Sequence, residues 1–248
     1  MSRVLEVAGL AKSFGAIEAV RGVDFGVDAG ELLAMIGPNG AGKTTCFDML
    51  NGQLAADSGS VELNGREIAG RKPREIWRLG VGRTFQITAT FGSMTVRENV
   101  QMALLSHHRR LADAWNRATD FRRDEADRLL ERVGMLDQAG RACSVLAYGD
   151  LKRVELAVAL AHSPQLLLMD EPTAGMGPAE RAELMALVAT LARERRVAVL
   201  FTEHDMDVVF AHADRIVVLH RGRVIATGTP AEVRASAEVR EVYLGRTA

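Results

Sequence analysis

Residues 32–44 read Leu-Leu-Ala-Met-Ile-Gly-Pro-Asn-Gly-Ala-Gly-Lys-Thr, and the rest of the chain can be interpreted around them. The first five are apolar, as in a strand buried on both faces. The others match G-x-x-x-x-G-K-[ST], a loop whose backbone N–H groups surround phosphate oxygens at the start of a helix. In such a loop Lys43 reaches the β- and γ-phosphates, and the Thr44 hydroxyl binds Mg²⁺. The predicted phosphate-binding residues are Gly37, Pro38, Asn39, Gly40, Ala41, Gly42, Lys43, Thr44 and Thr45.

A structural glycine turn is the alternative for this loop. Its position between an apolar strand and a helical pattern, residues 43–51, favours phosphate binding. A second apolar run, residues 166–169, ends in Asp170 and Glu171, and the carboxyl ends of such strands are where α/β sheets bind ligands. The two carboxylates suit different roles: Asp170 in the Mg²⁺ shell and Glu171 as the general base that activates water.

Short apolar runs alternate with helical patterns along the whole chain, which predicts an α/β fold. Asn64-Gly65 and Arg221-Gly222 are typical of hairpin turns. Residues 95–161 are helix-like and contain no convincing strand, as expected of a helical subdomain inserted into the sheet. Further strands are expected at residues 4–10, 20–27, 197–201 and 216–219, and further helices at residues 179–195 and after Asp205.

Composition excludes several classes of protein. The chain has 248 residues, with 31 basic and 32 acidic side chains, so it lacks the basic excess usual in nucleic-acid binders. Cys46 and Cys143 are too far apart to suggest a disulfide framework or a metal site, and a reducing compartment is expected. Alkylation of Cys46, in the helix after the loop, is expected to block nucleotide binding. Residues 1–14 contain no apolar run long enough for a signal peptide, and no stretch approaches the ~18–20 apolar residues of a membrane helix, so any membrane link is expected through a partner.

Four further motifs follow in an order that resembles the ATP-binding-cassette (ABC) family. Gln86, in Arg-Thr-Phe-Gln, is similar to the glutamine that binds Mg²⁺ and senses the γ-phosphate. His204 is similar to the switch histidine that bridges the γ-phosphate and the catalytic glutamate, and Phe14 to the ring that stacks on adenine. The family signature, LSGGQ, corresponds here to Leu146, Ala147, Tyr148, Gly149 and Asp150.

Each of these residues also has a structural interpretation. Gln86 could be a solvated polar residue at a strand edge, His204 a loop histidine, and Phe14 a core phenylalanine. All three residues stand where the order of motifs in the family would place them, and this favours the functional interpretation over the structural one. The resemblance implies a P-loop ATPase core with a mixed sheet and an antiparallel β subdomain, residues 1–92 and 162–248. Residues 93–161 would form the helical subdomain that carries the signature, within a single nucleotide-binding domain.

The signature departs from the family pattern. Ala147 replaces a serine, which removes a hydroxyl donor to phosphate worth about 1.5–3 kcal/mol, and Asp150 replaces a glutamine. Asp150 could cap the following helix but would repel phosphate. The family packs two cassettes head to tail, so these changes would weaken the partner's site. A heterodimer with unequal sites is therefore expected.

Residues 83–100, the signature, and Tyr-Leu-Gly at 243–245 resemble the longer cassette of branched-chain amino acid importers. The expected partners are a second cassette, transmembrane permease subunits and, indirectly, a binding protein. The chain would lie in the cytoplasm, on the inner face of the plasma membrane. Residues 94–100 would help form the groove that receives a cytoplasmic helix of the permease. Urea and short-chain amide importers share most of these features.

Two other classes of nucleotide-binding protein fit the sequence less well than a transport ATPase. ABC ATPases of DNA repair and translation carry long coiled-coil or zinc-binding inserts, or two cassettes in one chain, whereas this chain has a modest insert and a single phosphate loop. A regulator that binds ATP without hydrolysing it would not need Glu171 as a water-activating carboxylate. A transport ATPase with ATP and Mg²⁺ as cofactors is the favoured interpretation.

Overall fold

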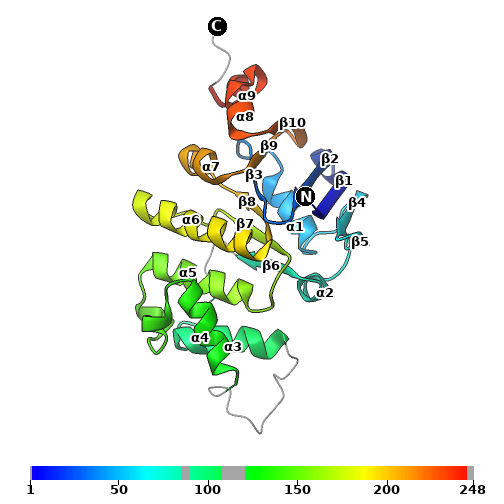
Figure 1. Cartoon of the computed structure of the whole chain (residues 1–248). Coiled ribbons are helices and arrows are strands. Elements are labelled where there is room, and N and C mark those ends of the chain that lie inside the picture. Colours follow the sequence, from blue (N-terminus) through cyan, green and yellow to red (C-terminus); the bar gives the residue numbers. More distant parts are fainter. Residues whose placement is uncertain (1, 85–89, 108–120, 245–248) are drawn as a thin grey trace.

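The structure, a computed structural model, describes residues 2–84, 90–107 and 121–244. Figure 1 shows two β-sheets in the upper half of the molecule, with a group of helices below them and the C-terminal helices at the opposite end. Both phosphate-site strands expected from the sequence lie in the larger sheet.

The larger sheet has six strands in the order β10-β9-β3-β8-β7-β6. Only β10 runs antiparallel to its neighbour, so the sheet is mixed. The carboxyl ends of its parallel strands therefore meet at one edge. The strands are β3 (Leu32–Ile36), β6 (Val81–Thr84), β7 (Leu166–Asp170), β8 (Ala198–Thr202), β9 (Arg215–His220) and β10 (Arg223–Gly228).

The smaller sheet has four antiparallel strands in the order β2-β1-β4-β5. Asn64 and Gly65 join β4 to β5 with φ angles of 50° and 73°, the left-handed pair that a two-residue hairpin turn requires. Arg221 and Gly222 join β9 to β10 in the same way, with φ angles of 48° and 78°. The strands are β1 (Arg3–Phe14), β2 (Ile17–Asp28), β4 (Ser58–Leu63) and β5 (Arg66–Glu67).

Local chemistry sets several helix ends. The Glu180 side chain accepts from the backbone N–H of Gly177, 3.0 Å away, at the start of α6, and Asp205 caps α7. The α-helices are α1 (Lys43–Leu50), α2 (Pro73–Arg78), α3 (Val96–His107), α4 (Arg123–Arg132), α5 (Tyr148–Leu160), α6 (Pro178–Arg195), α7 (Met206–His212), α8 (Pro230–Ala235) and α9 (Ala237–Leu244). Two 3₁₀ turns are η1 (Leu136–Gln138) and η2 (Cys143–Val145).

The six-stranded sheet separates two hydrophobic cores. Leu33 and Met35 of β3 point into a core shared with α1 and the smaller sheet. Leu32 and Ala34 point the other way, into a core shared with α3 to α7. Because successive residues of a strand face opposite sides, every residue of β3 is buried. Helices α1 and α5 consequently cover opposite faces of one sheet.

The predicted α/β fold is confirmed, including the strand before the loop at residues 32–36 and the largely helical character of residues 95–107 and 121–161, the part of 95–161 that the structure describes. Strand β6 and helix α2 were not predicted. Both are short and lack a clear periodic pattern, since β6 has four residues and α2 has six. Among the described helices, none combines the length and the apolar character needed to cross a membrane.

Candidate nucleotide site

The loop at residues 37–44 joins β3 to α1, as its sequence predicts. Gly42 has a φ of 106°, and a Cβ there would lie 2.6 Å from the carbonyl oxygen of Ala19. Only glycine therefore fits. The first turn of α1 carries no acidic residue and has no side-chain cap, so its partial positive charge faces the loop uncompensated.

Lys43 is folded back onto the loop. Its Nζ donates to the carbonyl oxygen of Gly37 at 2.6 Å and approaches that of Pro38 at 3.3 Å. Burial lowers the pKa of Lys43, while Glu171 and Asp170 oppose that shift. An anionic phosphate in the loop would favour the charged ammonium in the same way as these carboxylates.

The other loop residues offer their polar groups to solvent. Thr44 is exposed, and Thr45 is half-buried. Asn39 and Gly40 are exposed at the tip of the loop, whereas Ala41 is buried beneath it. The predicted phosphate-binding residues thus form one continuous cradle at the carboxyl end of β3.

Asp170 and Glu171 lie at the carboxyl end of β7. Asp170 Oδ1 accepts a hydrogen bond of 2.7 Å from Thr202 Oγ1. The backbone N–H of Glu171 donates to the same hydroxyl oxygen, 3.1 Å away. Glu171 has a φ of 48°, a left-handed conformation that is costly for a residue with a Cβ and that clusters at functional sites.

His204 meets Glu171, as the resemblance implied. Its Nε2 lies 2.7 Å from Glu171 Oε1, and its side chain is 52% exposed. The histidine follows β8, whose neighbour in the sheet is β7. The side chain therefore faces open space on one side and the carboxylate on the other.

Glu203 is a residue that the sequence interpretation missed. Its carboxylate is buried and accepts from the Thr173 backbone N–H at 2.9 Å and from the Thr173 hydroxyl at 2.5 Å. It also accepts from the backbone N–H of His204 at 3.2 Å. Glu203 thus ties the loop after Glu171 to the loop that carries His204. The signal in the sequence was a charged residue directly after an apolar strand.

Phe14 ends β1 with its side chain 50% exposed, so the alternative of a core phenylalanine is wrong. Lys12 Nζ lies 5.9 Å from the centre of its ring. An exposed aromatic face is available for stacking, and its role stays a prediction. Gln86 lies outside the described residues.

The signature residues are at the start of α5, on the other face of the sheet from the loop. Ala147 is the N-cap and supplies no side-chain hydrogen bond. The expectation that Asp150 caps α5 is wrong, because Asp150 lies in the first turn and accepts from Gln138 Nε2 at 3.0 Å. Tyr148 packs on Gly175, where an added Cβ would lie 3.4 Å from the ring. Leu146 and Asp150 are half-buried, and Gly149 is buried.

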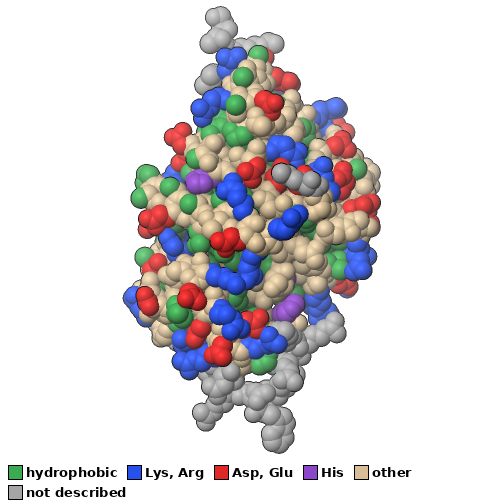
Figure 2. Space-filling model, viewed as in Figure 1, with side chains coloured by type: hydrophobic (Ala, Val, Ile, Leu, Met, Phe, Trp, Pro, Cys, Tyr) green, Lys and Arg blue, Asp and Glu red, His purple; other side chains and the backbone are tan. Residues whose placement is uncertain are grey.

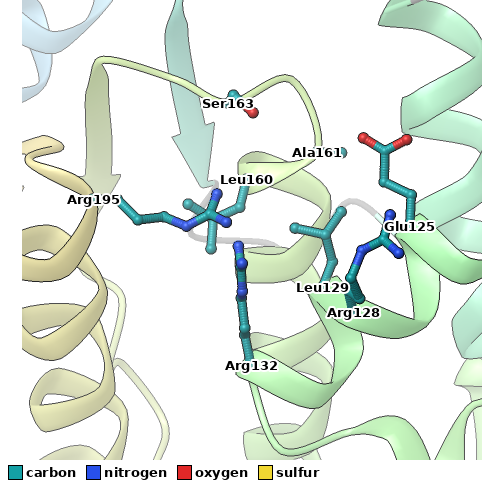
Figure 3. A pocket seen from close by; sticks show the side chains of 8 residues that line it. All are labelled: Glu125, Arg128, Leu129, Arg132, Leu160, Ala161, Ser163 and Arg195. Carbon is teal, nitrogen blue, oxygen red and sulfur yellow. The ribbon is translucent and has the colours of Figure 1, made fainter.

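A separate pocket of about 130 Å³ lies among α4, α5 and α6. Figure 3 shows Arg128 and Arg132 reaching into it from α4 and Arg195 from α6. Three helices end here, at Arg132, Leu160 and Arg195, and cations favour the negative ends of helices. In the view of Figure 2, several Lys and Arg side chains lie near the centre of the molecule, with Asp and Glu side chains among them. Helix-end electrostatics account for Arg132 and Arg195, which lie in the last turns of α4 and α6, without a ligand.

Comparisons with known proteins agree with the site. A family model described as "ABC transporter" matches residues 20–174, and one described as "Branched-chain amino acid ATP-binding cassette transporter" matches residues 223–248. The chain is 41% identical over 256 residues, 99% of each chain, to the high-affinity branched-chain amino acid transport ATP-binding protein BraF of Pseudomonas aeruginosa. It is 40% identical over 252 residues, 98% of each chain, to LivG of Salmonella typhimurium, which carries the same description.

Solved structures show the same relationship. A crystal structure of the ADP conformation of an ATP-binding cassette of an ABC transporter has a TM-score of 0.88 and 29% identity, covering 99% of this chain and 100% of that one. A nucleotide-free cassette has a TM-score of 0.86 at the same identity and the same coverage. The chain therefore belongs to the ABC transporter family, as an ATP-binding cassette.

Proposed function

We propose that this chain is the Mg²⁺-dependent ATPase subunit of a branched-chain amino acid importer. The contact between His204 and Glu171, beside a phosphate loop and Asp170, is the observation that carries the hydrolytic part. A cassette that only bound ATP would need no oriented carboxylate. The importer assignment and its substrate rest on the relatives' names, because the membrane and binding subunits select the substrate.

The donor set fits Mg²⁺. Among the described residues no cluster of three or more His, Cys, Asp or Glu side chains could hold a metal by itself. Mg²⁺ is usually held by one or two protein groups together with substrate phosphates and water. Thr44 and Asp170 supply a hydroxyl and a carboxylate for this purpose, and Gln86 would add an amide oxygen. Bound Mg²⁺ would neutralise charge on the phosphates.

The chain's own residues then divide the work of hydrolysis. Lys43 exchanges the carbonyls of Gly37 and Pro38 for the β- and γ-phosphate oxygens. Glu171 accepts the proton of the attacking water, and His204 holds the carboxylate in position through Oε1. Glu203 and Thr202 fix the loops that carry these groups. Phe14 stacks on the adenine.

A groove of about 450 Å³ suits a helix of a permease subunit. It is mainly apolar and is lined by α2, β6, the end of α3 and the end of α5, including Ile76, Trp77 and Ala103. Residues 94–100 do not line it, and three of them, Val96, Asn99 and Val100, are buried residues of α3 itself. We assign the groove to the permease, which would hold the chain on the inner face of the plasma membrane.

Two cassettes are proposed to close head to tail on ATP, with the loop of each facing the signature of the other. Residues 1–92 and 162–248 would move as the ATPase core and residues 93–161 as the helical subdomain. Because Ala147 and Asp150 weaken the site formed with the partner's loop, the partner is a different cassette. Full ATPase activity of this chain as a homodimer would overturn that assignment.

The decisive experiment is ATPase activity in vesicles that contain this chain, its permease and cassette partners, and purified binding protein. The binding protein is loaded with leucine, valine or urea, or left empty. Stimulation by leucine or valine supports the proposal, and stimulation by urea alone would move the assignment to a urea importer. Activity that ignores the permease and binding protein would contradict transport.

A further inference from the structure

Arg83 sits between the groove and the nucleotide site. It lies on β6 opposite Leu168 of β7, and its side chain is only 14% exposed. The guanidinium approaches Asp48 Oδ1 of α1 with Nη1 at 3.3 Å and with Nη2 at 3.4 Å. Nη1 also donates to Gln53 Oε1 at 2.9 Å. One side chain therefore joins the phosphate-loop helix to an edge strand of the large sheet.

The same guanidinium faces the carboxylate assigned to the metal. Nη2 lies 3.8 Å from Asp170 Oδ2, while Oδ1 accepts the hydrogen bond from Thr202. Both oxygens of Asp170 thus have a neighbour, one on β8 and one on β6. The distance to Arg83 is an ion-pair distance, longer than a hydrogen bond, so this neighbour is the one more easily displaced.

Arg83 and Gln53 also line the groove, together with Trp77 and Ser106. An occupant of the groove would therefore contact the side chain that faces Asp170 on its other side. The ordinary alternative is that Arg83 simply neutralises Asp48 and fastens β6 to α1. That alternative does not require the metal affinity of Asp170 to depend on Arg83.

We propose that Arg83 is a positioning residue that couples the groove to the metal site. When the groove is open, its positive charge faces Asp170 and lowers the affinity of that carboxylate for a divalent cation. A hydrogen-bond acceptor or carboxylate of a permease helix in the groove draws the guanidinium away, and Asp170 then binds the metal more tightly. This inference rests on the proposed Mg²⁺-dependent function and on the proposed occupant of the groove.

The sign of the effect follows from charge alone. A cation within ~4–6 Å of a carboxylate lowers the proton affinity of that carboxylate by a factor of ten or more. The cation opposes the binding of a metal ion to the same carboxylate for the same reason. R83Q removes the charge but keeps an amide donor for Asp48. R83K keeps the charge. R97Q is the matched control, because Arg97 pairs with Asp127 at 2.5 Å within the helical region and shares no contact with the site.

The test measures Mn²⁺ affinity of the ADP-saturated chain by EPR of the free ion, so that turnover plays no part. We expect about tenfold tighter Mn²⁺ binding in R83Q and wild-type affinity in R83K and R97Q. Unchanged or weaker binding in R83Q would overturn the proposal, and so would equally tight binding in R83K. If wild type shows no metal-dependent nucleotide binding, the proposed function fails whatever Arg83 does.

The coupling is tested in the assembled transporter. Assembly with the permease should tighten Mn²⁺ binding by the wild-type cassette toward the R83Q value, while R83Q itself should not respond. Loss of the response in R83Q distinguishes coupling from a fastening role, which would lower the thermal stability of R83Q without changing the response to the permease. An equal response in wild type and R83Q would contradict the coupling.

Discussion

His204 Nε2 lies 2.7 Å from Oε1 of Glu171, although the two residues follow different strands of the sheet, β8 and β7. Backbone hydrogen bonds hold both residues in place. The Thr202 hydroxyl accepts from the backbone N–H of Glu171, and the Glu203 carboxylate accepts from the backbone N–H of His204. Glu171 holds a left-handed backbone conformation, with φ at 48°, within this support. These contacts fix the direction in which one oxygen of the Glu171 carboxylate points.

E171Q should abolish turnover while leaving ATP binding intact. The loss of a general base typically lowers the rate by about 10²–10⁴-fold, and the chain should then accumulate as an ATP-bound dimer with its partner. Phosphate release and size-exclusion chromatography with ATP measure the two effects. E183Q serves as the control, because Glu183 pairs with Arg153 on the surface and lies outside the site.

H204A should act through the same carboxylate. If His204 only orients Glu171, then H204A in the E171Q background should cost nothing further, because residues that act as a unit are not additive. Turnover of the single and double variants measures this. An additional loss in the double variant would show that His204 has a separate role in the reaction.

Two phenylalanines allow a matched comparison of stability and binding. F201A removes a fully buried ring in β8 and should cost about 3–5 kcal/mol of unfolding free energy. F14A removes a half-exposed ring and should change stability by less than about 0.5 kcal/mol. If Phe14 stacks on adenine, F14A should still weaken ATP binding by about 1–3 kcal/mol, as in other base-stacking sites. Urea titration measures the stability of each variant, and an ATP-binding assay measures its affinity for the nucleotide. Unchanged ATP binding by F14A would remove Phe14 from the site.

The two cysteines should resist thiol reagents in the native chain. Both are buried, and burial raises the pKa of Cys46 to about 12 and raises the pKa of Cys143. At pH 8 about one Cys46 thiol in ten thousand is then ionised. Alkylation of Cys46 should therefore be slow in the folded chain, and its effect on nucleotide binding stays a prediction.

Titration with Ellman's reagent should show both thiols reacting only after denaturation. Because burial keeps Cys46 protonated in the folded chain, the free energy of unfolding should fall as the pH rises from the ordinary thiol pKa of about 9 toward 12, where only the unfolded chain releases this proton. Rapid reaction of a thiol in the native chain at pH 8 would contradict the burial of these side chains.

A147S should strengthen the partner's nucleotide site. It restores the hydroxyl that the signature lacks, a bond to a charged group worth about 1.5–3 kcal/mol, or about 10–100-fold in affinity. Ala147 is exposed at the start of α5, so the serine fits without repacking. ATP binding at the partner's loop in the assembled heterodimer measures the effect. S144A, in the turn just before α5, is a control outside the five signature residues.

Most of the fold could be predicted from local patterns in the sequence. The strand, loop and helix at residues 32–50 are defined by apolar residues and glycines that are contiguous in sequence, and the hairpin turns at Asn64 and Arg221 by residue pairs. The family was also predicted correctly. A helix beside the signature was expected and α5 is found there, but the suggested cap, Asp150, lies inside its first turn, because any of several residues can precede the first turn of a helix.

The supporting contacts could not be predicted in the same way. Arg83 reaches Asp48 and Asp170 only because β6 pairs with β7, and nothing near Arg83 in sequence indicates that pairing. Glu203 is adjacent to His204, yet its role depends on Thr173, which lies in the segment that follows another strand, β7. Such residues are specified by sheet order, and sheet order is not a local property.

The placement of α1 and α5 on opposite faces of one sheet has a kinetic consequence. A chain built this way cannot close its own signature over its own loop without taking the sheet apart. Hydrolysis should therefore be second order in cassette at low concentration, and its specific activity should vanish on dilution unless a permease holds two cassettes together. In the cell, assembly with the membrane would then act as the switch that prevents free chains from wasting ATP.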